Sequence, residues 1–234
     1  MMTLDQLLHD APVFHGATSL GLSEPILREI DRRLRLLGDT TATLETGAGM
    51  STVLFALRGC EHRCITPSRE ETQRITNYCH RRAIPLDRVQ FVHEVSQRAL
   101  PALEPRPLDF ALIDGSHAFP TVFLDWFHIA ARLKRGGQLL IDDLQLWTGH
   151  VLAEFLQRQP EWRFECELES RAAIFTKLEE GAELREWTEQ PFVVEKSAPL
   201  IWRYRARRAT ELLQQGKLGE LGRAIVRGVR PLSR

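Results

Sequence analysis

Three aspartates and a histidine follow two apolar runs of the chain, in places where they could share one cation or one proton. Asp114 closes the first run and is followed three residues later by His117, while Asp142 and Asp143 directly follow the second. Carboxylates held close together repel one another unless a cation or a proton offsets their charge. These four side chains are the strongest indication of chemistry in the sequence.

Each member of this group also has a purely structural interpretation. Asp143 could cap a following helix, as aspartates after strands often do. Asp114 with Gly115 could serve a turn, and His117 could be an exposed loop residue. The chemical interpretation depends on all four meeting at one edge of one sheet.

Short apolar strands that alternate with amphipathic helices would position these side chains. The patterns predict strands near 41–45, 62–66, 88–93, 108–114 and 137–142, with helices near 51–58, 69–82, 97–103, 120–134 and 150–158. Segments 162–166 and 172–176 alternate like two strands of a hairpin. The order predicts an α/β fold with a doubly wound, mostly parallel, seven-stranded sheet and a C-terminal antiparallel hairpin. The carboxyl ends of its parallel strands would open on one edge, where such folds bind ligands.

Helical extensions are expected before and after the α/β domain in the sequence. Residues 3–9 and a helix capped by Ser23 form an N-terminal helical cap over 1–40, and the α/β domain covers 41–178. A connecting arm and a basic helical tail follow over 179–234. Nine Lys or Arg and two Glu from Ile201 to Arg234 give the tail a charge of +7, against −7 for residues 1–200. This face could simply be solvated, or it could contact an acidic partner or a membrane surface through Arg223, Arg227 and Arg230.

The remaining composition is that of an ordinary globular protein. The chain has 234 residues, 43% hydrophobic and 26% charged residues, and a formal net charge of zero, which gives no general electrostatic reason to bind nucleic acid. No apolar stretch has the length of a membrane span, and the N-terminus lacks a signal pattern. The four cysteines lack a framework spacing, so we expect free thiols and a cytoplasmic protein.

A glycine turn follows the first predicted strand. The segment 45–52 reads Glu-Thr-Gly-Ala-Gly-Met-Ser-Thr, in which Gly47 and Gly49 allow a sharp turn and the close approach of a ligand. A dinucleotide fingerprint would place a third glycine at Thr52. Glu45 suits a ligand that carries an ammonium group and opposes a pyrophosphate, which disfavours a nicotinamide dinucleotide.

This turn resembles the first motif of class I S-adenosylmethionine-dependent methyltransferases, an acidic residue followed by x-Gly-x-Gly. The resemblance covers residues 25–178 and implies a Rossmann-like methyltransferase fold. Residues 113–117 and 141–143 look like those of metal-dependent O-methyltransferases that act on natural-product sugars. The resemblance implies S-adenosylmethionine and Mg²⁺ or another divalent cation as cofactors. It implies metal ligands at Asp114, Asp142 and Asp143, a base at His117, and cofactor contacts at Glu45, Gly47, Gly49, Ser51, Thr66 and Asp114.

One position departs from the family pattern. Thr66 stands where these enzymes end the second strand with the acidic residue that holds the ribose hydroxyls, although Glu70 or Glu71 could reach the same place from the next helix.

The resemblance implies methyl transfer to a small hydroxylated acceptor, plausibly one that carries a sugar. A cation could lower the pKa of the acceptor hydroxyl. His117 could take its proton, because an imidazole ordinarily has a pKa of about 6.5, which suits a base at neutral pH. Two other functions stay open: a catalytically silent methyltransferase-like module that binds a partner, and a metal-dependent enzyme of another class. The arm and tail could also mediate a homo-oligomer.

Overall fold

The computed structural model describes residues 2–15, 21–38, 41–180, 185–217 and 219–220, with side chains from 11 to 15 left out. They form two units, Met1–Glu183 and Leu184–Arg234. In the first unit the helices are α1 (Leu4–His15), α2 (Glu24–Leu37), α3 (Met50–Leu57), α4 (Arg69–Arg81), α5 (Ser96–Ala102), α6 (Thr121–Ala130) and α7 (Trp147–Arg158). The strands are β1 (Ala42–Thr46), β2 (Glu61–Ile65), β3 (Val89–Val92), β4 (Leu108–Ile113), β5 (Leu133–Ile141), β6 (Trp162–Leu168) and β7 (Ala172–Lys177).

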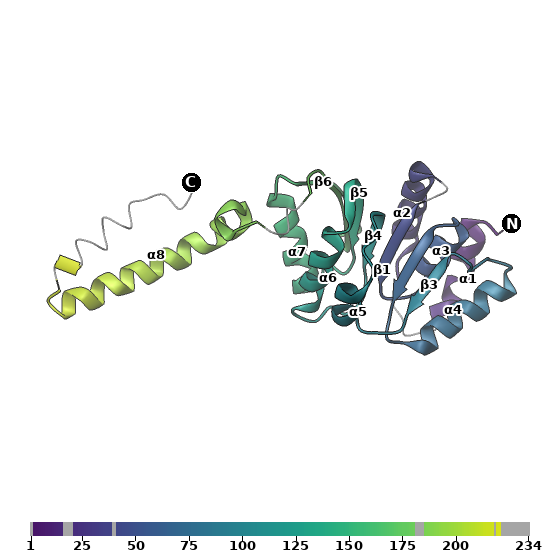
Figure 1. Ribbon diagram of the computed structural model, residues 1–234, viewed down its shortest axis with the longest axis horizontal. Coiled ribbons are helices and arrows are strands. Elements are labelled where there is room, and N and C mark those ends of the chain that lie inside the picture. Colours follow the sequence, from purple (N-terminus) through teal and green to yellow (C-terminus); the bar gives the residue numbers. More distant parts are fainter. Residues whose placement is uncertain (1, 16–20, 39–40, 181–184, 218, 221–234) are drawn as a thin grey trace. The chain divides into compact units, whose positions relative to one another are not determined.

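The seven strands form a single sheet in the order β3-β2-β1-β4-β5-β7-β6 (Figure 1). The first five strands run parallel, and the β6–β7 hairpin adds antiparallel to β5. The strand order reverses direction at β1 and β4, and such a switch point is where α/β sheets open a crevice for ligands. The predicted doubly wound sheet with its terminal hairpin is confirmed.

Two apolar cores cover the two faces of this sheet. Helices α1 to α4 cover one face and α5, α6 and α7 cover the other (Figure 1). The first core includes alternate strand residues such as Phe110 and Leu112, and the second includes Ala111 and Ile113. The alternation follows from the two-residue period of a strand, which sends successive side chains to opposite faces. Both faces of β4 are therefore buried, which explains its continuous apolar sequence.

Four predicted boundaries are wrong, the first being the end of the helix expected over 3–9, which continues to His15. The helix expected over 120–134 ends at Ala130, because Leu133 already pairs with Leu108 and begins a long β5. Trp147, expected in a loop, begins α7. In the second unit, Pro191 begins the helix α8 (Pro191–Gln214), after the short helix η2 (Trp187–Glu189), where an irregular arm was predicted. Proline is favoured at the first position of a helix because it has no N–H to leave unbonded there.

Three further expectations concern the basic tail, membrane-spanning helices and the cysteines. Arg223, Arg227 and Arg230 of the predicted basic contact lie outside the described residues. None of the helices in the described parts of the chain combines the length and apolar composition that a membrane crossing requires. The four cysteines are free, as expected.

Candidate active site

The glycine turn after β1 requires glycine at its first position. Gly47 has φ +94°, and a Cβ there would lie 2.1 Å from the backbone oxygen of Asp114. Its N–H donates to the carbonyl of Ile65 at 2.9 Å, which joins the ends of β1 and β2. The turn thus draws three strand ends together just before the start of α3.

A cavity of about 410 Å³ lies at the carboxyl ends of the parallel strands. Its wall consists of segments 46–48, 65–68, 95–97 and 114–116, together with Glu71. These segments follow β1, β2 and β4 or lead into α5, so the cavity occupies the crevice that the strand order predicts. Its volume is within the usual range for small-molecule sites. Among the predicted cofactor residues, Gly47, Thr66 and Asp114 line it.

Thr66 shares the cavity wall with a carboxylate that comes from α4. Its hydroxyl donates to Glu71 Oε2 at 3.1 Å and accepts from the N–H of Ser68 at 3.2 Å. The Ser68 hydroxyl in turn caps α4 by accepting from the N–H of Glu71 at 3.2 Å. The alternative left open by the sequence is therefore realised in part: an acidic side chain reaches the end of β2 although the strand ends in threonine.

Asp114, His117 and Asp143 form a compact group of possible metal ligands. Each contributes one ligand atom, and these atoms lie within 4.8 Å of one another. His117 Nε2 lies 2.9 Å from Asp143 Oδ2. Asp143 has φ +58°, a left-handed conformation that is uncommon for a residue with a side chain. The Gln145 side-chain amide donates to its Oδ1 at 2.5 Å, which helps to hold it there.

The start of α7 holds this group from behind. The Thr148 hydroxyl donates to the backbone carbonyl of His117 at 2.7 Å, which ties the loop after β4 to α7. A Cβ at Gly149 would lie 2.7 Å from the Asp143 carbonyl, so only glycine allows the helix to approach so closely. The helix that follows β5 thus positions both His117 and Asp143.

Asp142 has a different environment from the one predicted. Its buried carboxylate accepts from Arg171 at both oxygens, Nη2 to Oδ2 at 2.7 Å and Nε to Oδ1 at 3.1 Å. Both oxygens are thus used in a fork-shaped ion pair, which is a strong arrangement for arginine and carboxylate. That Asp142 is a metal ligand stays a prediction, and this contact counts against it, because the carboxylate already binds a cation that the protein itself supplies.

Negative charge remains in excess at this edge. Burial, followed by the charges of Asp142 and Asp143, raises the pKa of Asp114 well above its usual value. Hydrogen bonding to Asp142 raises the pKa of Arg171, so its guanidinium stays charged. Two carboxylates and an imidazole remain for a cation, and this donor set fits Mg²⁺ and still better Mn²⁺, which accepts imidazole nitrogen readily.

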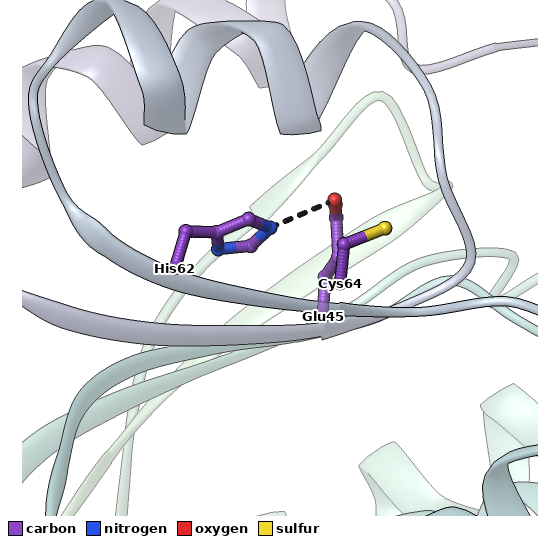
Figure 2. A group of neighbouring side chains, drawn as sticks. All are labelled: Glu45, His62 and Cys64. Carbon is purple, nitrogen blue, oxygen red and sulfur yellow. Dashed lines mark hydrogen bonds and ion pairs between the residues drawn. The ribbon is translucent and has the colours of Figure 1, made fainter. Parts of the chain in front are cut away.

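Glu45, predicted to contact the cofactor, lies behind the turn and not on the cavity wall. It is fully buried and accepts from the Ser51 hydroxyl at 2.5 Å, from the Thr52 hydroxyl, and from His62, whose Nε2 lies 3.0 Å from Oε1. Figure 2 shows the imidazole of His62 directed at this carboxylate, with Cys64 alongside. The expected contact of Glu45 with the cofactor stays a prediction, and these hydrogen bonds count against a direct one. The Ser51 hydroxyl is already bonded to Glu45, and this bond joins the end of β1 to the start of α3 on the two sides of the glycine turn.

Sequence reasoning did not find Arg171. It lies at the β6–β7 turn, 28 positions after Asp143, and an isolated arginine there has no local signal of its role. Only the antiparallel addition of β7 to β5 brings Ala173 opposite Ile141 and so places Arg171 beside the aspartates.

Comparisons with known proteins agree with this geometry. Residues 44–144 match a family described as "Methyltransferase domain". No curated protein sequence matches the chain significantly.

Solved structures share the fold at low sequence identity. TomG, an O-methyltransferase from Streptomyces achromogenes in complex with SAM, is 15% identical with a TM-score of 0.61, over 76% of this chain and 92% of TomG. Cofactor-bound Rv0187 from MTB is 14% identical with a TM-score of 0.61, over 75% and 89% of the two chains. An rRNA methylase from Streptococcus thermophilus is 16% identical with a TM-score of 0.54, over 68% and 99%. The matched segment, the sheet order and the glycine turn agree with the resemblance drawn from the residues, and the methyltransferase-domain match covers residues 44–144 of the chain.

Proposed function

We propose that this protein is an S-adenosylmethionine-dependent O-methyltransferase that uses a divalent cation and acts on a small hydroxylated acceptor. One observation carries the proposal: Asp114 lines the cavity at the strand ends and also belongs to the group with His117 and Asp143. A methyl donor in the cavity would therefore lie beside an acceptor hydroxyl at that group. Methyl transfer needs this proximity, because the attacking oxygen must approach the methyl in line.

Different residues around the cavity would bind different parts of the donor. The glycine turn places Gly47 and Ala48 on the cavity wall, where the backbone can approach the donor closely. Thr66 and Glu71 offer a hydroxyl and a carboxylate on the same wall, which suits a pair of ribose hydroxyls. We infer that Glu71 takes the place of the acidic residue that the family keeps at the end of the second strand.

His117 has two possible roles that exclude each other. A divalent cation, when bound, would lower the pKa of the acceptor hydroxyl. His117 can then accept the hydroxyl proton at Nδ1 if its Nε2–H donates to Asp143, as the 2.9 Å contact allows. A ring nitrogen that coordinates the cation cannot take a proton as well. We propose the base role, because Asp143 orients the imidazole through Nε2.

His117→Ala separates these roles. The base role predicts that turnover falls by roughly 10²–10⁴-fold while the Mn²⁺ affinity changes little. A large loss of Mn²⁺ affinity in H117A would instead assign His117 to the cation. Turnover within about threefold of the native protein on the true acceptor would reject both roles.

Calorimetry with S-adenosylmethionine, with and without Mg²⁺, tests the donor site. We expect binding in both conditions, and a loss of affinity of about tenfold in Glu71→Gln, the size expected for one charge-assisted hydrogen bond. Glu70→Gln is the matched control, because Glu70 is exposed one position earlier on α4 and does not line the cavity. If S-adenosylmethionine gives no binding heat both with and without Mg²⁺, the silent binding module would be favoured. Binding without methyl transfer to any hydroxylated acceptor would favour an enzyme of another class.

A further inference from the structure

Arg171 is fixed beside the acidic group by both its side chain and its backbone. Nη2 and Nε bind the two oxygens of Asp142, and Nε also lies 3.6 Å from Asp143 Oδ1. Nη1 donates to the carbonyl of Gly21 at 3.2 Å. Its own carbonyl accepts from the N–H of Leu144 at 2.7 Å. The guanidinium therefore has a defined place and is not a surface charge that moves freely.

This guanidinium changes the charge that a divalent cation would meet. Asp142 is removed from the ligand set, since both of its oxygens face Arg171. Asp143 is shared, because it lies between Arg171 and the ligand atoms of Asp114 and His117. A cation bound at Asp143 would stand only a few ångström from a fixed positive charge, and in a partly buried place the repulsion is weakly screened.

We propose that Arg171 is a resident cation of the acidic edge that competes with the divalent cation. It neutralises Asp142, limits the carboxylate ligands to Asp114 and Asp143, and weakens ion binding there. The inference rests on the proposed function for its purpose, since it makes the catalytic cation a loosely held, exchangeable one. It also makes a prediction opposite to that of a structural ion pair: removal of Arg171 strengthens cation binding.

Mn²⁺ titration of the full chain, followed by the electron paramagnetic resonance signal of free Mn²⁺, tests this directly. We expect Arg171→Met to bind Mn²⁺ at least roughly tenfold more tightly than the native chain, because one nearby positive charge is gone and Asp142 is released. Arg163→Met is the matched control, because Arg163 pairs with Glu165 on β6 at 2.8 Å and should leave the Mn²⁺ affinity unchanged. Equal or weaker binding in R171M overturns the proposal.

A second pair of variants covers the event that R171M does not fold. Removing the arginine leaves a buried carboxylate without its partner, and such changes can be strongly destabilising. Asp142→Asn removes that charge and keeps an oxygen that can bind a cation. We expect the double variant R171M/D142N to bind Mn²⁺ more tightly than D142N, and equal or weaker binding overturns the proposal.

The failure of this inference is distinguishable from failure of the proposed enzyme. If the native chain and the variants all fail to bind Mn²⁺, the inference is overturned, while calorimetry with the methyl donor still tests the donor site. If R171M binds Mn²⁺ more tightly and no acceptor is methylated, the inference is supported and the enzyme assignment is the part that fails.

Discussion

Two groups in the described part of the chain resemble metal sites, and only one of them has ligand atoms with lone pairs available for a cation. Glu45, His62 and Cys64 form the first, and Asp114, His117 and Asp143 form the second; in each, the possible ligand atoms lie within 4.8 Å of one another. Each contains a carboxylate and an imidazole. The first lies between the sheet and α3 and is fully buried, whereas the second is partly exposed at the strand ends.

Hydrogen bonding accounts for the difference. In the buried group, Glu45 accepts from Ser51, Thr52 and His62, the other nitrogen of His62 meets the Thr43 hydroxyl at 2.8 Å, and the Cys64 thiol donates to the Gly47 carbonyl at 3.3 Å. Burial raises the pKa of Cys64 well above its usual value, so the thiol keeps its proton and is a poor ligand. Residue types and spacing alone do not identify a metal site, because the lone pairs must also be available.

The largest expected effect is at the partly exposed group. Asp143→Asn should reduce turnover by about 10³-fold and weaken Mn²⁺ binding on the order of 100-fold, because a charged ligand of the cation and the partner of His117 are lost together. Cys64→Ser should leave the Mn²⁺ affinity unchanged. Mn²⁺ titrations of both variants and methyl-transfer assays of D143N provide the measurements. A Mn²⁺ affinity that falls in C64S and not in D143N would reverse the assignment of the two groups.

A smaller effect, on stability, is expected at the buried group. His62→Leu removes a charge-assisted bond to Glu45 and the stacking on Phe55, whose ring centroid lies 4.4 Å away. We expect the free energy of unfolding to fall by about 3–4 kcal/mol, measured by denaturant titration. In a double-mutant cycle with Glu45→Gln, the two changes should be strongly non-additive, since they share one bond. Additive losses would show that His62 and Glu45 act independently.

The same contrast explains how far the sequence could predict the structure. The alternation of apolar runs and helices predicts the sheet, and the position of Asp114 and Asp143 after apolar strands predicts that they meet at one edge. These features depend on local periodicity and on the parallel topology. Three of the boundary errors fall at Ala130, Trp147 and Pro191, where tertiary pairing or a helix start overrides the local pattern.

Side-chain partners that come from distant segments could not be predicted in this way. Glu45 has the sequence position of a ligand-binding carboxylate, yet it points to the face covered by α3. There it meets His62, which lies on the neighbouring strand β2. Asp142 and Asp143 are adjacent in sequence, yet only one binds Arg171 on both oxygens. Both aspartates follow the end of β5, where Asp143 has a left-handed backbone with φ +58° and Asp142 does not, and a hairpin nearly 30 residues later supplies the cation.

A third buried acid differs from Glu45 and Asp142 because no described residue pairs with its charge, and its effect on stability should therefore depend on pH. Asp125 on α6 is fully buried, and among the residues that the structure describes none donates a hydrogen bond to either of its oxygens. Burial raises its pKa to about 6, despite opposing effects of the Ser96 and Thr46 hydroxyls. The unfolded chain ionises this acid from about pH 4, whereas the folded chain does so only near pH 6, so stability is lost as the pH rises through that window. The loss should reach about 2–3 kcal/mol above pH 6.

Asp125→Asn should therefore stabilise the protein at pH 7 by an amount of that order and have little effect below pH 4. Denaturant titrations of both chains at pH 4, 5, 6 and 7 measure the difference. Asp109→Asn is the control, because Asp109 already pairs with Lys134 at 2.6 Å and accepts from the N–H of Ala42. A difference between D125N and the native chain that does not change with pH would show that Asp125 does not titrate in this range.

The smallest effect is expected at Cys64 itself, and it tests whether the buried group depends on its sulfur. A serine hydroxyl at this position can donate to the Gly47 carbonyl as the thiol does, while Glu45 keeps its bonds to Ser51, Thr52 and His62. We expect C64S to lose about 1 kcal/mol or less of stability, because the thiol is a weak donor and most of the network remains. A zinc ion held by Cys64 would give a different result, since a hydroxyl is a much poorer ligand for zinc than sulfur. C64S would then lose several kcal/mol together with bound zinc, so denaturant titration with zinc analysis of the same samples separates a hydrogen-bonded network from a metal site.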